Sequence, residues 1–266
     1  MKVLFRADAG PEIGDGHLMR CFALACALKD NGAEITLLSA PNKSQSRALW
    51  QSHFKVIDWP HSADLATETA ALLPYLETES VDALVIDSYA FDAAILTQLS
   101  KKTRCAIFND LGDVDAPVAL VINQNAGGED YAGAYTRAEK TALGPAYACL
   151  GSQITAQRPC ARRGILISFG NAQPDGLSKT IVQELRAKDT STMISVVAPD
   201  DITITPDALL KRLSPQPLAP LLAQARGAII GGGVTALEAA YLGTPTVILP
   251  IADNQRPGAG ALAGAG

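Results

Sequence analysis

Short segments rich in Val, Ile and Leu recur along this chain and alternate with longer stretches of mixed polar and apolar residues. This alternation is typical of βαβ units, in which parallel strands are buried on both faces and helices cover the sheet. The clearest helix is expected over 17–29, because Asn31-Gly32 follows it as a stop signal. In the first half we expect strands at 2–5, 34–38, 54–58, 83–87, 105–108 and 119–122.

The second half shows the same alternation after a polar, irregular segment over 151–163. We therefore predict an α/β fold of two doubly wound, Rossmann-like domains facing across a cleft, with bounds 1–150 and 151–266. One large α/β domain with an irregular insert is the alternative. The Gly/Ala-rich last residues, 258–266, favour neither helix nor strand, and we expect a truncated or frayed end there. The expected strands are 165–169, 193–197, 228–230 and 246–250, and the expected helices are 176–187, 218–225 and 235–242.

Composition narrows the class of protein and the partners that it can have. Hydrophobic residues make up 48% of the 266 residues and charged residues 18%, which is typical of a globular protein. The net charge is −5 and no segment concentrates Lys or Arg, so nucleic acid is not an expected partner. No apolar run reaches the roughly 18 residues of a membrane span, and no signal peptide is recognisable. We expect a cytoplasmic protein without membrane insertion, a monomer or weak oligomer.

The five cysteines are scattered and form no C-x-x-C pair, so neither a disulfide framework nor a zinc site is indicated. We interpret them as small buried hydrophobic residues. Asp113-Val114-Asp115 has a D-x-D form that can hold a divalent ion, but three common residues in a surface turn are a weak signal. No metal and no cofactor are expected.

The first expected strand leads into a glycine-containing turn that ends in Gly14-Asp15-Gly16-His17. This is not a dinucleotide-binding fingerprint, because Met19 stands where the third glycine is required. His17 would begin a helix at the carboxyl ends of the strands, where open α/β sheets place their ligands, and it can act as a base near neutral pH. Capping or packing is the alternative role. We expect the other two histidines, His53 and His61, to lie at the surface.

A second strand, glycine loop and helix occur in the second half, where Gly231, Gly232 and Gly233 precede Thr235 and Glu238. Backbone N–H groups of such a loop can bind a diphosphate, and the helix dipole adds to the attraction. Glu238 can accept hydrogen bonds from ribose hydroxyls, or it can merely offset the helix dipole. Asn254 and Gln255 follow the next strand and are expected at the same edge of the sheet.

Several of these segments resemble one family of enzymes. The run Arg6-Ala7-Asp8-Ala9 followed by Ile13-Gly14-x-Gly16-His17-x-Met19-Arg20-Cys21 is similar to the N-terminal signature of the UDP-2,4-diacetamido-2,4,6-trideoxy-β-L-altropyranose hydrolases of pseudaminic acid biosynthesis. The resemblance continues through 121–125, through Leu143-Gly144-Pro145-x-Tyr147, and through the second glycine loop to Arg256.

This resemblance implies a two-domain fold of the glycosyltransferase-B (GT-B) type, related to the transferase that makes lipid II. It implies that His17 is the catalytic base and that UDP lies mainly on the second domain. The residues implied to bind the substrate are Arg6, Asp8, Gly14, Gly16, Tyr89, Asn254 and Gln255, and those implied to bind UDP are Gly170, Gly231, Gly232, Gly233, Thr235 and Glu238.

The chain departs from the family pattern at three places. The family's Phe-Gly-Gly-x-Asp-Pro loop is Phe169-Gly170-Asn171-Ala172-Gln173-Pro174 here. Its Val-Asp-His-Tyr segment is Ile86-Asp87-Ser88-Tyr89, and its Ile-Asp-Asp-Leu segment is Phe108-Asn109-Asp110-Leu111.

A single base is sufficient for the implied reaction. UDP leaves without the protonation that an alcohol requires, so one base for water and one site for the departing anion suffice, and a single displacement predicts inversion. Two alternatives stay open at this point. One is a UDP-sugar-dependent glycosyltransferase of the same fold, and the other is a UDP-sugar binding protein that has lost its activity.

Overall fold

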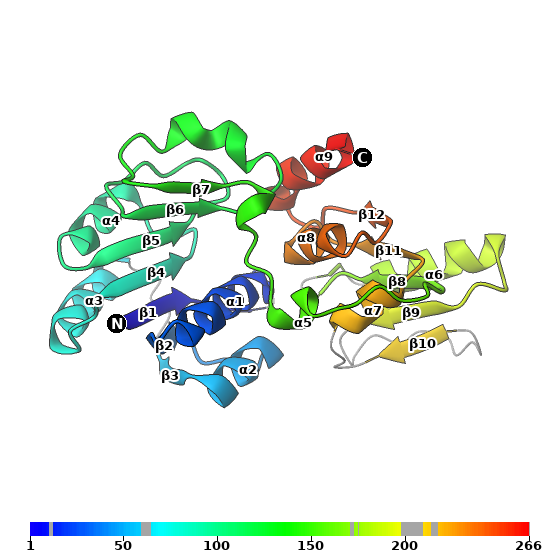
Figure 1. Ribbon diagram of the computed structural model, residues 1–266, viewed down its shortest axis with the longest axis horizontal. Helices are drawn as coiled ribbons and strands as arrows, with labels where there is room; N and C mark the ends of the chain where they lie inside the picture. The colour runs from blue at the N-terminus through cyan, green and yellow to red at the C-terminus, as the bar shows by residue number, and fades with distance from the viewer. Residues whose placement is uncertain are drawn as a thin grey trace. The chain divides into compact units, whose positions relative to one another are not determined.

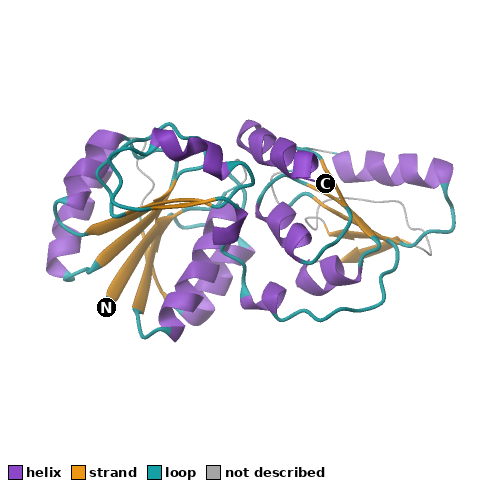
Figure 2. Ribbon diagram, turned by 45° about the horizontal axis from the view of Figure 1, so that its top comes forward, coloured by secondary structure: helices purple, strands orange, loops and turns teal. Residues whose placement is uncertain are grey.

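A computed structural model describes residues 1–10, 13–59, 65–170, 173–174, 176–197 and 218–265, and the backbone of 210–213. The chain divides into two compact units, Met1–Gly151 and Ser152–Gly266 (Figure 1). Each unit contains one parallel sheet covered by helices (Figure 2). The predicted α/β class with two doubly wound parallel sheets is confirmed.

The sheet of the first unit has seven strands in the order β3-β2-β1-β4-β5-β6-β7, and every neighbouring pair is parallel. The strands are β1 (Lys2–Ala7), β2 (Glu34–Ser39), β3 (Lys55–Asp58), β4 (Ala83–Asp87), β5 (Arg104–Phe108), β6 (Leu120–Asn123) and β7 (Thr141–Leu143). The helices are α1 (Gly16–Asp30), α2 (Gln45–His53), α3 (Leu65–Thr78) and α4 (Ala93–Ser100).

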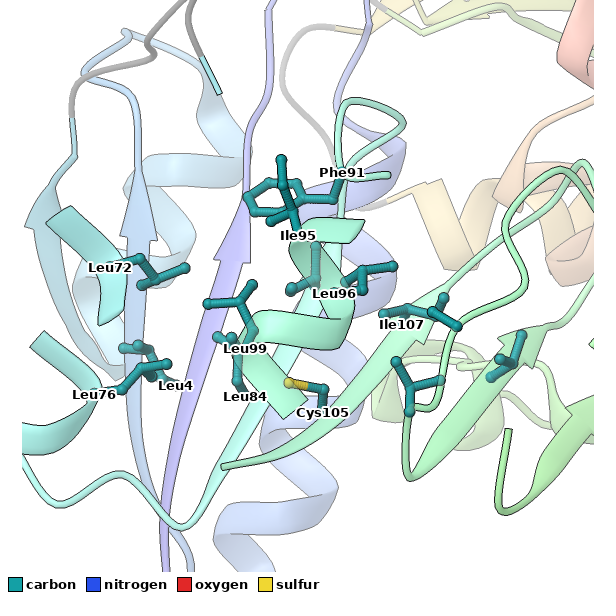
Figure 3. Close-up of a cluster of buried hydrophobic side chains, with 14 of the residues drawn as sticks. Leu4, Leu72, Leu76, Leu84, Phe91, Ile95, Leu96, Leu99, Cys105 and Ile107 are labelled. Carbon is teal, nitrogen blue, oxygen red and sulfur yellow. The ribbon is translucent and has the colours of Figure 1, made fainter. Parts of the chain in front are cut away.

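Two hydrophobic clusters cover the two faces of this sheet. Leu4 and Leu84 pack against α3 and α4 in the cluster that Figure 3 shows. Their strand neighbours Val3, Phe5 and Val85 point the other way and pack against α1 and α2. Successive side chains of a strand face opposite sides, so the sequence of each strand decides which helices its side chains meet.

The same alternation continues to the polar residues at the carboxyl ends of the strands. Asp87 ends β4 and shares the face of Val85, which places its carboxylate against α1. Arg6 in β1 shares the face of Leu4, which places its guanidinium against α3. The two polar groups therefore lie on opposite faces of the sheet.

The sheet of the second unit has five parallel strands in the order β10-β9-β8-β11-β12. The strands are β8 (Ile165–Ser168), β9 (Ile194–Val197), β10 (Leu210–Leu213), β11 (Gly227–Ile230) and β12 (Thr246–Ile248). The helices are α5 (Ser152–Thr155), α6 (Leu177–Lys188), α7 (Leu218–Gln224), α8 (Val234–Tyr241) and α9 (Arg256–Ala265).

Three sequence expectations need correction. The strands β7 and β10 were not expected, because each is a short edge strand without an extended Val/Ile run. The Gly/Ala-rich end was expected to be irregular but forms α9, in which Ala259 is buried and Leu262 packs against the core of the unit. This packing outweighs the low helix propensity of glycine. Of the five cysteines expected to be buried, Cys21 and Cys105 are buried, Cys26 and Cys149 are half-buried, and Cys160 is exposed.

Two further findings concern the surface. His53 is exposed, as expected, whereas His61 lies outside the described residues. Within the part of the chain that the structure describes, no helix is both long and apolar enough to cross a membrane.

Candidate active site

Helix α1 carries His17, Arg20 and Cys21 on the side that faces the end of β4. Their spacing of three and four residues places them on one helical face, and all three contact Asp87. His17 Nδ1 lies 2.5 Å from Asp87 Oδ1, and Arg20 donates Nε to Asp87 Oδ2 at 2.6 Å and a terminal N–H to Oδ1 at 2.7 Å. The Asp87 side chain is thus held by a two-pronged guanidinium contact and by the imidazole.

The charge of Asp87 is fixed by these neighbours. Burial alone would raise the pKa of the Asp87 carboxyl, but the charges of Arg20 and His17 and their hydrogen bonds hold it well below its usual range. Asp87 is therefore ionised near neutral pH and can only accept hydrogen bonds.

An ionised Asp87 decides which nitrogen of His17 carries the proton. Because Asp87 can only accept, Nδ1 of His17 must be the donor, and the neutral imidazole then keeps a lone pair on Nε2. His17 is 9% exposed, and the ring of its neighbour Tyr89 approaches the imidazole edge-on at 5.1 Å between ring centroids. In this tautomer Nε2 is able to accept a proton, and Asp87 would stabilise an imidazolium at this position.

A second carboxylate, Asp110, lies beyond β5 and completes the cluster. Arg20 donates to both of its oxygens, at 3.0 and 2.9 Å. The Tyr89 hydroxyl and the Asn125 amide donate to it as well, each at 2.8 Å. The Arg20 guanidinium also stacks over the Phe108 ring, 4.6 Å from its centroid. We call His17, Arg20, Asp87, Tyr89 and Asp110 the His17 cluster.

Not every residue predicted for this site joins the His17 cluster. Arg6 is only 1% exposed and donates to Glu68 at 2.5 Å and to Asp8 at 2.6 Å, on the α3 face of the sheet. Asp8 also accepts from the backbone N–H of Ala40 at 2.7 Å and so links the ends of β1 and β2. These contacts give Arg6 and Asp8 a structural role, and their predicted role in substrate binding stays a prediction.

The two glycines before His17 shape the entry to α1. Gly14 has φ of 69°, a left-handed conformation that favours glycine, and its N–H donates to the Gly10 carbonyl at 2.7 Å. Gly16 is the first residue of α1. This turn places His17 in the first turn of the helix.

In the second unit, the loop between β11 and α8 holds the three predicted glycines, and Gln255 lies across it. The Gln255 Oε1 atom accepts from Gly232 N at 2.9 Å and from Ile251 N at 3.0 Å. A Cβ atom at Gly232 would lie 3.0 Å from Gln255 Cβ, so a larger residue there would press against Gln255. Gly231 N points to the Ser168 carbonyl at 3.4 Å.

These contacts refine the predicted diphosphate site. The sequence pattern does not distinguish the three glycine N–H groups as donors. In the structure, Gly232 N already donates to Gln255 and Gly231 N to the Ser168 carbonyl. The N–H groups of Val234 and Thr235 begin α8 and have no carbonyl partner within the helix. Anion binding at this loop would therefore rely on the first turn of α8.

Glu238 lies one turn further along α8 and is partly buried. Burial raises the pKa of its carboxyl to about 7. Asn254 and Gln255 form a short 3-10 helix after β12, and Gly170 follows β8 with φ of 70°. Asn171 and Ala172 of the loop after Gly170 lie outside the described residues.

The D-x-D segment has other partners. Asp113 accepts from the Asn109 amide at 2.8 Å, while Asp115 accepts from the Thr136 hydroxyl at 2.6 Å and from Arg137 N. No group of three or more His, Cys, Asp or Glu side chains suited to a metal ion occurs among the described residues.

Sequence reasoning assigned no site role to Arg20, Asp87, Asp110 or Asn125. The signal was available for two of them. Asp87 is the last residue of its strand and, two residues after Val85, shares the face of Val85. Arg20 lies about one helical turn after His17. For Asp110 and Asn125, which lie in loops, no periodic pattern indicates where the side chain points.

The chain has distant relatives in sequence. No protein-family model matches the chain. It is 25% identical to an uncharacterised protein of Methanocaldococcus jannaschii, an alignment that covers 96% of this chain and 57% of that protein. It is 23% identical to the spore coat polysaccharide biosynthesis protein SpsG of Bacillus subtilis, covering 96% of this chain and 79% of SpsG. The chain thus spans little more than half of the first relative's length.

Solved structures show the same fold at low sequence identity. The glycosyltransferase SnogD of Streptomyces nogalater aligns with a TM-score of 0.59 and 16% identity, over 98% of this chain and 85% of that one. UGT89C1 of Arabidopsis thaliana, solved with UDP-L-rhamnose, aligns with a TM-score of 0.67 and 14% identity, over 99% of this chain and 82% of that one. The predicted GT-B type of fold is confirmed.

Proposed function

We propose that this chain acts on a nucleotide sugar and hydrolyses a UDP-linked diacetamido-trideoxy sugar to the free sugar and UDP, as a step of pseudaminic acid biosynthesis. The observation that carries the proposed general base is the contact between His17 Nδ1 and Asp87 Oδ1, which leaves Nε2 able to accept a proton. The GT-B fold and the UDP-L-rhamnose complex of UGT89C1 support a UDP-sugar as the substrate, and the name of SpsG supports a role in polysaccharide biosynthesis. The choice of sugar rests on the sequence resemblance.

In the proposed reaction, His17 Nε2 takes a proton from water as the water oxygen bonds to the anomeric carbon. The bond between that carbon and the UDP oxygen breaks, UDP leaves with both electrons, and the sugar is released with inverted configuration. Asp87 stabilises the imidazolium, which then returns its proton to solvent. The first turn of α8 would hold the diphosphate and Glu238 the ribose, with Asn254 and Gln255 near the sugar.

A glycosyltransferase is the second candidate, and the likeness to SnogD favours it. In that reaction an acceptor hydroxyl takes the place of water and the same His17 Nε2 accepts its proton. A UDP-sugar binding protein without activity is the third, and the altered loop after Phe169 is the feature that fits it.

The experiment incubates the purified protein with a panel of UDP-sugars in ¹⁸O-water, with and without EDTA, and measures released UDP and the position of the label. We expect UDP release without an added acceptor, label in the free sugar alone, and no effect of EDTA. UDP release only when an acceptor is supplied would favour the transferase, and label in the β-phosphate would reject attack at carbon.

The matched variants are His17→Asn and Asp87→Asn. For His17→Asn we expect turnover to fall by about 10² to 10⁴ while the dissociation constant for UDP stays near the wild-type value, because the general base is lost and the UDP contacts are kept. Asp87→Asn should also lower turnover strongly, since an amide can donate to Nδ1 and move the proton to Nε2. Retention of more than a tenth of wild-type turnover in His17→Asn would remove His17 from the role of base.

A further inference from the structure

Asp110 is a buried carboxylate to which neither the sequence nor the proposed reaction assigns a task. It is 7% exposed and receives hydrogen bonds from three side chains that lie on different segments: Arg20 on α1, Tyr89 after β4 and Asn125 after β6. Asp110 therefore connects the helix that carries the base with the loop that carries Tyr89.

Arg20 transmits the position of Asp110 to Asp87. Its Nε and one terminal nitrogen donate to Asp87, and its other terminal nitrogen donates to Asp110. Because a guanidinium is planar and rigid, fixing one end of it on Asp110 fixes the two N–H groups that orient Asp87. Asp87 in turn orients His17.

Asp110 also sets the net charge of the His17 cluster. Two buried carboxylates, Asp87 and Asp110, share one guanidinium, so the formal charge of the cluster is −1 when His17 is neutral and 0 when it is an imidazolium. A net charge in a buried site is unfavourable. Asp110 therefore favours the positive charge that His17 acquires when it removes a proton from water.

The two thiols that interact with Arg20 and Asp87 add no charge to the His17 cluster near neutral pH. Burial raises the pKa of the Cys21 thiol well above its usual value, and burial raises the pKa of Cys149, which interacts with Arg20 and Asp87, to about 11. The Tyr89 hydroxyl donates a hydrogen bond to Asp110. The charge within the His17 cluster therefore depends on Arg20, Asp87 and Asp110 besides His17 itself.

We propose that Asp110 is a positioning residue of the proposed hydrolysis, which acts through Arg20 to hold Asp87 against His17 and to balance the charge of the imidazolium, and through the Tyr89 hydroxyl to hold that ring beside the imidazole. The proposal rests on the proposed function of His17. Asp110 itself touches neither water nor sugar in this reaction.

The test compares Asp110→Asn with Asp82→Asn, which removes an exposed carboxylate at the other end of β4 and changes the net charge equally. For Asp110→Asn we expect kcat to fall by about tenfold or more, with the acid limb of the rate profile moved to lower pH, because less negative charge supports the imidazolium. KM and the dissociation constant for UDP should stay within about twofold, since the residues proposed to bind UDP belong to the other unit. Asp82→Asn should match the wild type in all four quantities.

Asp110→Glu serves as the conservative variant, because it keeps the charge but displaces the carboxylate. We expect it to restore the wild-type pH profile and to recover only part of kcat. A wild-type kcat and pH profile in folded Asp110→Asn would overturn the proposal, and so would a wild-type kcat in Asp110→Glu if Asp110→Asn does not fold. Loss of turnover in His17→Asn together with full turnover in Asp110→Asn rejects this inference alone, whereas full turnover in His17→Asn rejects the proposed function as well.

Discussion

The protonation of Glu238 gives the proposed UDP site a pH dependence that can be worked out. With a pKa of about 7, roughly one in eleven Glu238 side chains is ionised at pH 6 and about ten in eleven at pH 8. Ribose hydroxyls donate more strongly to a carboxylate than to a neutral carboxyl group. If Glu238 accepts hydrogen bonds from the ribose, its protonation should therefore lower the affinity for UDP by up to about tenfold as the pH falls from 8 to 6.

The assay is calorimetric titration of UDP at pH 6, 7 and 8 with the wild type and with Glu238→Gln. The diphosphate also gains protons over this range, so the informative quantity is the difference between the two proteins. We expect the affinity of the wild type to change more steeply than that of Glu238→Gln, and the variant to bind UDP more weakly at pH 8. Parallel affinity curves would refute the assignment of Glu238 to the ribose.

The stability of the ligand-free protein should also depend on the protonation of Glu238. It should fall as the pH rises, whereas the affinity for UDP should rise. The folded-state pKa of Glu238 is raised above its ordinary value of 4.5, so folding favours the neutral form. The stabilising contribution of the neutral form is complete below about pH 4.5 and is lost as the pH rises through about 7. Urea unfolding at pH 5.5 and pH 8 should show a larger loss of stability on going to pH 8 for the wild type than for Glu238→Gln.

Two further predictions concern buried polar contacts. Gln255→Glu should weaken UDP binding by about tenfold or more, because a carboxylate beside Gly232 and Ile251 repels the diphosphate. Gln255→Ala should weaken UDP binding less, and calorimetric titration compares the UDP affinities of the two variants. Glu68→Gln should lower the free energy of unfolding by about 3 kcal/mol, because Asp8 is then the one charged partner of Arg6 among the described residues, and it should leave UDP affinity unchanged. Urea unfolding measures the loss, and a loss below about 0.5 kcal/mol would contradict the prediction.

The parts of the fold that follow from local patterns could be predicted from the sequence. The strands around Val85 and Ile107 and the helix that begins near His17 have the periodicity and the stop signals that sequence reasoning detects. The helix α9 could not be predicted, because it depends on the burial of Ala259 and the packing of Leu262. Tertiary packing of this kind leaves no mark in the local sequence.

The candidate site divides in the same way. His17 could be found because a glycine turn marks the entry to its helix. The partners of His17 could be found only in part, since the contact between Arg20 and Asp110 depends on how a loop after β5 lies against α1. The pairing of Arg6 with Glu68 follows from strand alternation once the sheet order is known, and sequence alone does not provide that order.

The strand order of the first unit affects when the contacts of the His17 cluster form during folding. His17 meets a partner 70 residues away and Arg20 one that is 90 residues away, because β1 lies beside β4 and the loop after β5 closes over α1. Contacts of such high sequence separation form late, after the entropy of closing long loops has been lost. A refolding chain should therefore regain helical circular dichroism before it regains turnover, and turnover should report the docking of β4 onto β1 and of β5 onto β4.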